Sequence, residues 1–158
     1  MFTSPFFTLF HTLLSVIGIF AGLVLAGGLI SGRPLDGWSA TFIVTTFLTS
    51  LTGFGFPFPP LTPGHVIGAI SVLVLPVVMY AQYGKKLAGG WKTVYVVGAM
   101  VTLYFNSFVL VVQLFKRIPA LIALAPTQKE GPFAVTQLLV AVLFLALGRA
   151  ALDGSKRA

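Results

Sequence analysis

Cysteine is absent from this 158-residue sequence, and acidic residues are scarce. Without a thiol, the chain has no disulfide, no thiolate metal site and no cysteine nucleophile. Ten lysines and arginines outnumber three acids, and Asp36, Glu130 and Asp153 all fall in predicted loops or in the tail. Proton-coupled carriers typically place ionisable pairs inside the membrane bundle, so this distribution argues against such a carrier.

Catalytic motifs are also missing. No set of nucleophile, base and orienting residue is recognisable, and no glycine-rich loop of the phosphate-binding kind occurs. The candidate metal ligands are two histidines, which alone make a weak zinc site. The sequence therefore does not predict an independent enzyme.

Apolar residues, by contrast, dominate the composition. They make up 57% of the chain, charged residues make up 8%, and the mean hydropathy is +1.00. These values lie far outside the range of soluble domains and predict an integral membrane protein. The net charge of +7 then indicates that basic residues lie in cytoplasmic loops and contact anionic lipid headgroups. It does not indicate nucleic-acid binding.

Five apolar segments predict an all-α membrane protein, a single polytopic helical domain over residues 1–158. A transmembrane helix needs about 20 apolar residues. The predicted spans cover residues 6–30, 39–54, 65–83, 93–115 and 133–152. The second is short and rich in hydroxyls that should face other helices, so the alternative is four spans plus one re-entrant segment. Residues 120–125 are too few to span and should lie along the surface or fold back.

Orientation follows from the basic residues, which concentrate on the cytoplasmic side of membrane proteins. With five spans, seven of them share one side and three share the other. With four spans the division is six against four, which is a poorer asymmetry. We therefore expect five spans with the N-terminus outside and the C-terminus cytoplasmic.

The two histidines both fall near the outer face in this topology. His11 lies about 9 Å inside the first span at 1.5 Å per residue, and His65 opens the third span from the same side. Phe54, Phe56 and Phe58 lie in the loop that precedes His65. An ionisable residue inside a span suggests a functional site, although either histidine could simply bond a nearby carbonyl, and His65 could serve only to start its helix.

The functional hypothesis for this pair is a tetrapyrrole site. Imidazoles are common haem-iron ligands, and bundle cofactors are held from facing helices. His11 and His65 would be the two axial ligands of one haem b, with space for the macrocycle at Gly18, Gly64 and Gly68. In these two histidines the chain resembles small bis-histidine b-type membrane cytochromes, and the resemblance implies electron transfer. The chain lacks the four histidines of the two-haem families, so its single haem would carry electrons only part of the way across the membrane.

Further polar and small residues form helical stripes. Thr102, Asn106 and Gln113 share one face of the fourth span, and Gln137 enters from the outer end of the fifth. Together with the outer histidines, they would line a path in the alternative that the chain transports a small solute or protons. Gly18 and Gly22 should let another helix approach closely. A third alternative is thus an accessory subunit of a larger membrane complex, or a homo-oligomer.

Two stretches carry a family resemblance. Residues 51–68 contain Thr-Gly-Phe-Gly-Phe-Pro-Phe followed by Leu-Thr-Pro-Gly-His, and residues 124–133 contain Leu-Ala-Pro-Thr-Gln. In these motifs the chain resembles a group of small bacterial multi-pass membrane proteins of unassigned function. The resemblance extends over most of the chain and implies a bacterial inner-membrane location, without implying an activity.

Overall fold

The computed structural model describes residues 4–33, 35–56 and 61–157, and every regular element in these ranges is helical. The long helices are α1 (Pro5–Ile30), α2 (Asp36–Gly53), α3 (Pro63–Met79), α4 (Trp91–Arg117) and α6 (Gly131–Ser155). A π-helical turn, η1 (Tyr80–Gly84), extends α3, and the short α5 (Pro119–Leu124) lies between α4 and α6. The all-α prediction is confirmed for these residues.

Membrane-spanning character is supported for four helical segments. Pro5–Ile30, Pro63–Gly84, Trp91–Arg117 and Gly131–Ser155 are long and apolar enough to cross a bilayer. The 18-residue α2 is not among them, because its serines and threonines lower its hydropathy. The chain is thus an all-α protein with four candidate spans among the described residues.

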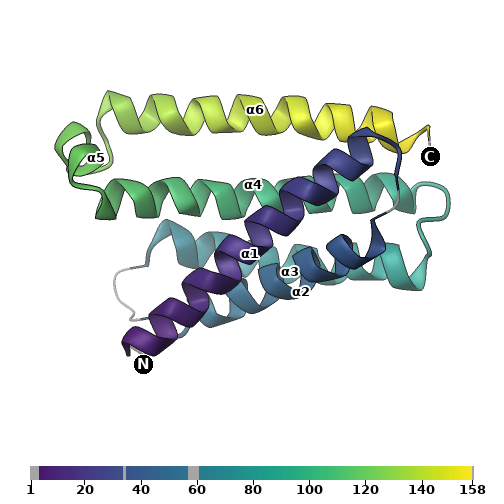
Figure 1. Cartoon of the computed structure of the whole chain (residues 1–158), viewed down its shortest axis with the longest axis horizontal. Coiled ribbons are helices and arrows are strands. Elements are labelled where there is room, and N and C mark those ends of the chain that lie inside the picture. The colour runs from purple at the N-terminus through teal and green to yellow at the C-terminus, as the bar shows by residue number, and fades with distance from the viewer. Residues whose placement is uncertain (1–3, 34, 57–60, 158) are drawn as a thin grey trace.

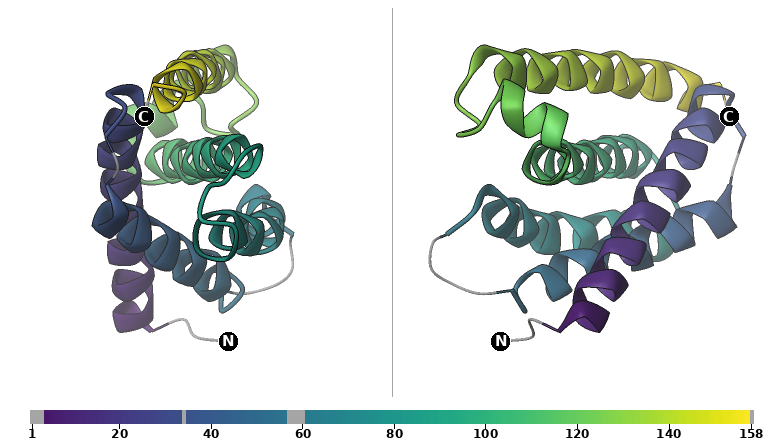
Figure 2. Two further views of the ribbon diagram at one scale, coloured as in Figure 1. Left: turned by 90° about the vertical axis from the view of Figure 1, so that its right-hand side faces the viewer. Right: turned by 60° about the vertical axis from the view of Figure 1, so that its left-hand side comes forward.

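The long helices run back and forth along the longest axis of the molecule (Figure 1). The two termini consequently lie near opposite ends. Helix α4 contacts α1, α2, α3 and α6, and Figure 2 shows it in the middle of the bundle when viewed from one end. Helix α1 crosses obliquely over α2 and α4 and reaches the end of α6.

Helix boundaries follow local signals. Ser4 caps α1, its hydroxyl oxygen accepting the Phe7 N–H at 3.2 Å, and Pro5 follows at the first position, where no backbone donor is needed. Helices α2, α3, α4 and α6 begin two or three residues before the predicted spans. Their first turns contain polar, glycine or proline residues, which belong to the helix but not to its apolar part.

Proline 76 lies inside α3, and a wide turn follows it. The N–H of Lys85 bonds the carbonyl of Tyr80 at 2.9 Å, five residues back. Such π turns are rare and occur often at functional sites. This one contains Gln82, whose side chain bonds α2.

Close packing joins α1 to its neighbours. A Cβ atom placed on Gly22 would lie 2.8 Å from Cδ2 of Phe42 on α2, and it would also meet the side chain of Leu103 on α4. At the other end of the chain, Gly154 packs directly on the carbonyl oxygen of Ile30. The Arg157 guanidinium donates to the same oxygen at 3.1 Å, so the end of α6 is fastened to the end of α1.

Candidate functional site

His11 projects from α1 toward the C-terminal end of α2. Its Nδ1 lies 2.8 Å from the hydroxyl oxygen of Thr52. That hydroxyl donates its proton to the Leu48 carbonyl at 2.7 Å, so it must accept from His11. The Nδ1 atom therefore carries the proton, and in the neutral ring Nε2 keeps its lone pair. Metal-binding imidazoles use this tautomer.

His65 has the opposite tautomer. The backbone N–H of Thr62 donates to its Nδ1 at 3.2 Å, and the Thr62 hydroxyl oxygen lies 2.9 Å from the same nitrogen. Because Nδ1 accepts, the proton of the neutral ring lies on Nε2. In return, the Thr62 side chain accepts the backbone N–H of His65, which completes a capping box with histidine in the usual Glu or Gln position. His65 is buried, with 7% of its surface exposed.

Aromatic side chains from the end of α2 and the turn after it lie against both imidazoles. Phe56 meets His11 edge to face with ring centroids 4.9 Å apart, and Phe54 stacks on His65 at 6.4 Å. The end of α2 thus contacts both histidines. Phe58, predicted to join this group, lies outside the described residues.

This arrangement does not fit an iron held between the two rings. Axial ligation needs a nitrogen lone pair from each imidazole, and the Nδ1 lone pair of His65 accepts from Thr62 while its Nε2 is protonated. Gly18 was expected to make room for a macrocycle, but it faces α2. A Cβ atom placed on Gly18 would lie 3.1 Å from the Thr45 hydroxyl oxygen and 3.2 Å from that of Thr46. Gly68 similarly faces the ring of Phe54. Within the described residues, no three His, Asp or Glu side chains gather into a metal site.

The polar residues predicted to share a stripe have separate surroundings. Thr102 is buried and returns its hydroxyl to the Gly98 carbonyl at 2.9 Å. Asn106 is buried and donates to the Thr46 hydroxyl at 3.3 Å. Gln137 donates to the Phe108 carbonyl at 3.2 Å, and its own carbonyl oxygen is buried without a partner. Gln113, however, is exposed.

One buried polar cluster was not predicted. The Ser39 hydroxyl donates to Oε1 of Gln82 at 2.6 Å and lies 2.6 Å from the Tyr95 hydroxyl. Since the Ser39 proton goes to Gln82, Tyr95 must donate to Ser39. The cluster joins the start of α2 to η1 and to the start of α4. Three residues so far apart in the sequence leave no periodic signal.

Comparison with known proteins adds no relatives. No family model, no curated protein and no solved structure matches this chain. The geometry of the described residues is therefore the basis for the functional conclusion.

Proposed function

We propose that this chain is a five-span protein of the bacterial inner membrane. It acts as an accessory subunit of a larger membrane complex, or it assembles with further copies of itself as a homo-oligomer. Helix α2 supplies the fifth span. It runs along the same axis as the more apolar helices and contacts both α1 and α3 (Figure 1). Its 18 residues extend about 27 Å, and the part after the polar first turn, residues 39–53, extends about 22 Å. This part is shorter than the hydrocarbon thickness of about 30 Å, so the bilayer would thin locally around α2.

Hydroxyl groups on α2 are compatible with this placement. Thr45 and Ser50 return their hydroxyls to carbonyls one turn earlier, at 2.7 and 2.9 Å. Such bonds within the helix let Ser and Thr reside in lipid. These bonds support the proposal that α2 crosses the membrane despite its low hydropathy.

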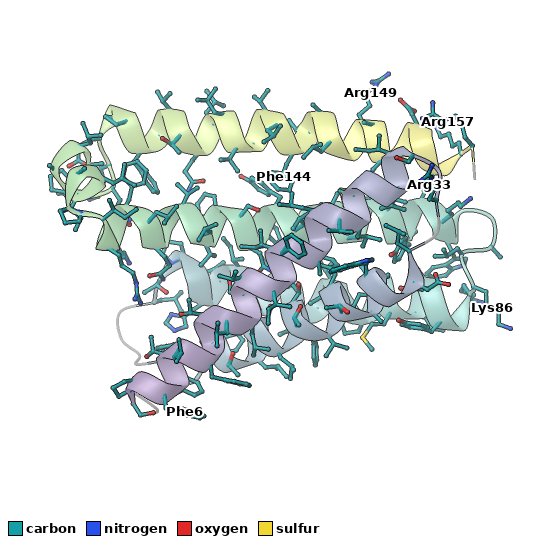
Figure 3. All side chains as sticks on the ribbon, viewed as in Figure 1. Phe6, Arg33, Lys86, Phe144, Arg149 and Arg157 are labelled. Atoms are coloured by element: carbon teal, nitrogen blue, oxygen red, sulfur yellow. The ribbon has the colours of Figure 1, made fainter. Side chains whose placement is uncertain are left out.

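The distribution of basic residues supports a cytoplasmic C-terminus. Arg33, Lys86, Arg149 and Arg157 lie at one end of the bundle, opposite Phe6 (Figure 3). Lys116 and Arg117, at the end of α4, lie at the other end. Because basic residues accumulate in the cytoplasm, we place the first group inside.

Cysteine labelling tests this topology, since the natural chain has no background thiol. In intact cells, a membrane-impermeant maleimide should label Lys129→Cys and not Lys86→Cys. Ser31→Cys distinguishes the five-span from the four-span topology. Five spans place residue 31 on the cytoplasmic side of the membrane, and four spans place it on the outer side. Labelling of Ser31→Cys in intact cells would refute the five-span proposal.

Helix α6 carries the accessory role in our proposal. Only 11% of the most apolar 18-residue stretch of α6 is buried, against 33–39% of the corresponding stretches in the other three candidate spans. Its outer face exposes Leu139, Leu143 and the small Ala146, which follow one another along a single helical stripe. Small residues allow close helix approach in lipid, where packing drives association.

The polar interior is consistent with a structural role. Asn106 joins α4 to α2, Gln137 joins α6 to α4, and Ser39 joins α2 to η1 and α4. These side chains bond other helices of the same chain. Their contacts support the bundle itself.

The accessory role predicts a complex of fixed stoichiometry after gentle extraction from the native membrane. Ala146→Phe should release the partner, because the ring would occupy the face of α6 where the partner approaches. Ala69→Phe, on the exposed side of α3, is the matched control and should leave the complex intact. A wild-type chain that is monomeric after native extraction would contradict the proposal.

Haem binding and transport stay predictions outside this proposal. A Soret band that is present in the natural chain and lost in both His11→Ala and His65→Ala would establish a bis-histidine haem. A natural chain without a Soret band, after expression with adequate haem, would exclude one. Solute-dependent flux in proteoliposomes would establish transport.

A further inference from the structure

A groove of about 680 Å³ lies between α4 and α6. Its volume is typical of small-molecule sites, which measure about 300–1,000 Å³. The apolar walls include Met100, Val101, Tyr104, Phe144, Leu145 and Gly148. The groove is open on one side, since Leu145 at its edge is 74% exposed, whereas Met100 and Phe144 form a buried floor. Figure 3 shows Phe144 between the two helices and Arg149 farther toward the C-terminal end of α6.

Charged side chains line the C-terminal end of this apolar groove. Arg149, Asp153 and Lys156 all contribute to the lining. The Asp153 carboxylate lies 3.6 Å from the Lys156 ammonium and 4.0 Å from Nε of Arg149, so one acid serves two cations. The cationic side chains are 87% and 72% exposed, and ion pairs this exposed are weak. The end of the groove therefore has a net positive charge available to a ligand.

We propose that the groove binds one anionic phospholipid, with an acyl chain between α4 and α6 and the phosphate against Arg149 and Lys156. From Ala141 to Lys156 the groove extends about 22 Å along α6 at 1.5 Å per residue. One leaflet of the hydrocarbon core is about 15 Å deep, and the headgroup region lies beyond it. An apolar groove of this length with cations at one end matches a lipid in shape and in charge. Basic sites between transmembrane helices bind anionic headgroups in this way.

Glycine 148 provides a way to fill the groove without disturbing the fold. A Cβ placed there would meet only Met100, at 3.8 Å, which is ordinary contact. The side chain of Gly148→Leu would extend into the acyl-chain region. Gly27→Leu is the matched control, since a Cβ on Gly27 in α1 has no neighbour within 4 Å. Both replacements improve helix propensity, so loss of binding would not reflect a weaker helix.

The test uses the full chain in detergent, incubated with phosphatidylglycerol or phosphatidylcholine and examined by native mass spectrometry. We expect about one phosphatidylglycerol per chain in preference to phosphatidylcholine. Gly148→Leu should abolish its retention, and Gly27→Leu should retain it. Arg149→Gln and Lys156→Gln should each weaken binding about fivefold, as expected for one basic residue at an anionic surface. Asp153→Asn should strengthen binding, while Lys86→Gln should have no effect.

Several results would overturn the inference. Equal retention of the two lipids would exclude an anionic site, and full retention in Gly148→Leu would place the lipid elsewhere. Equal binding of glycerol phosphate, which lacks an acyl chain, would show that the groove is not used. A wild-type dimer that Gly148→Leu converts to a monomer would identify a second copy as the occupant. Ala146, used to test the accessory role, does not line the groove, so the two proposals can fail separately.

Discussion

The side-chain nitrogen of Asn106 lies 3.3 Å from the hydroxyl oxygen of Thr46, which joins the middle of α4 to α2. Gly18 of α1 lies beside the same pair, since a Cβ placed there would be 3.2 Å from the Thr46 hydroxyl and 3.6 Å from the Asn106 nitrogen. Three helices thus meet around one buried polar contact. Hydrogen bonds between helices in a membrane contribute about 0.6 kcal/mol on average and seldom more than about 2 kcal/mol.

We expect Asn106→Leu and Thr46→Val each to destabilise the bundle by about 1 kcal/mol. A double-mutant cycle, measured by unfolding in mixed micelles, should give a coupling energy near 0.6 kcal/mol. Thr102→Val is a suitable control, because the Thr102 hydroxyl bonds its own helix. Additive effects of the first two substitutions would show that the Asn106–Thr46 bond contributes nothing.

Gly22→Val should destabilise the chain by about 1–3 kcal/mol, the usual effect of overpacking. A Cβ at this position would lie 2.8 Å from the ring of Phe42, so α1 would have to move away from α2 and α4. Gly27→Val adds the same side chain where nothing lies within 4 Å and should be nearly neutral. Equal thermal stability of the two variants would contradict this account of α1 packing.

His65→Ala should lower stability by about 1 kcal/mol, because the capping box at the start of α3 loses one of its two hydrogen bonds. His65→Gln should recover part of this loss, since Gln is a normal partner in a capping box. Thermal unfolding of the three proteins measures both effects. If Gln and Ala at position 65 were equally destabilising, the cap would not be the main role of His65.

Glu130 makes the stability of the loop before α6 dependent on pH. Its carboxylate accepts from the Thr127 hydroxyl at 2.8 Å and from the backbone N–H groups of Thr127 and Lys129, and these bonds lower its pKa. Because the folded pKa lies below the unfolded value, the stabilisation is complete above the unfolded value of about 4.5. It is then lost as the pH falls through the folded pKa.

Unfolding measured between pH 7 and pH 3 should show this effect by comparison with Glu130→Gln. The variant should be less stable than the natural chain at pH 7, and the difference should shrink on acidification. Lys129→Gln is the control and should leave the pH dependence unchanged. A difference that grows as the pH falls would contradict the direction of the pKa shift.

Much of the fold was predictable because apolar length and turn residues act locally. Pro5, Pro63 and Pro119 lie in the first turns of helices, and the alternation of apolar and basic segments located the long helices. The hydroxyl-rich character of α2 likewise predicted that it packs against other helices. Such signals operate within one or two helical turns.

The site was harder to predict, because it depends on which helices are neighbours. Gln113 shares a stripe with Asn106, but near the end of α4 the buried residues are instead Val111, Val112 and Phe115. The tautomer of His65 depends on a bond to Thr62, which the Thr-x-x-His spacing could have suggested. The groove between α4 and α6 is a product of helix spacing and has no motif of its own.

The contact of Gly154 and Arg157 with the carbonyl of Ile30 has a consequence for biogenesis. Helix α1 receives this neighbour only after α6 has been synthesised, more than 120 residues later. Until then the Ile30 carbonyl at the end of α1 lacks the hydrogen bond from the Arg157 guanidinium. Removing the last turn of α6, or attaching a bulky group there, would therefore loosen the end of α1, more than 120 residues away in sequence.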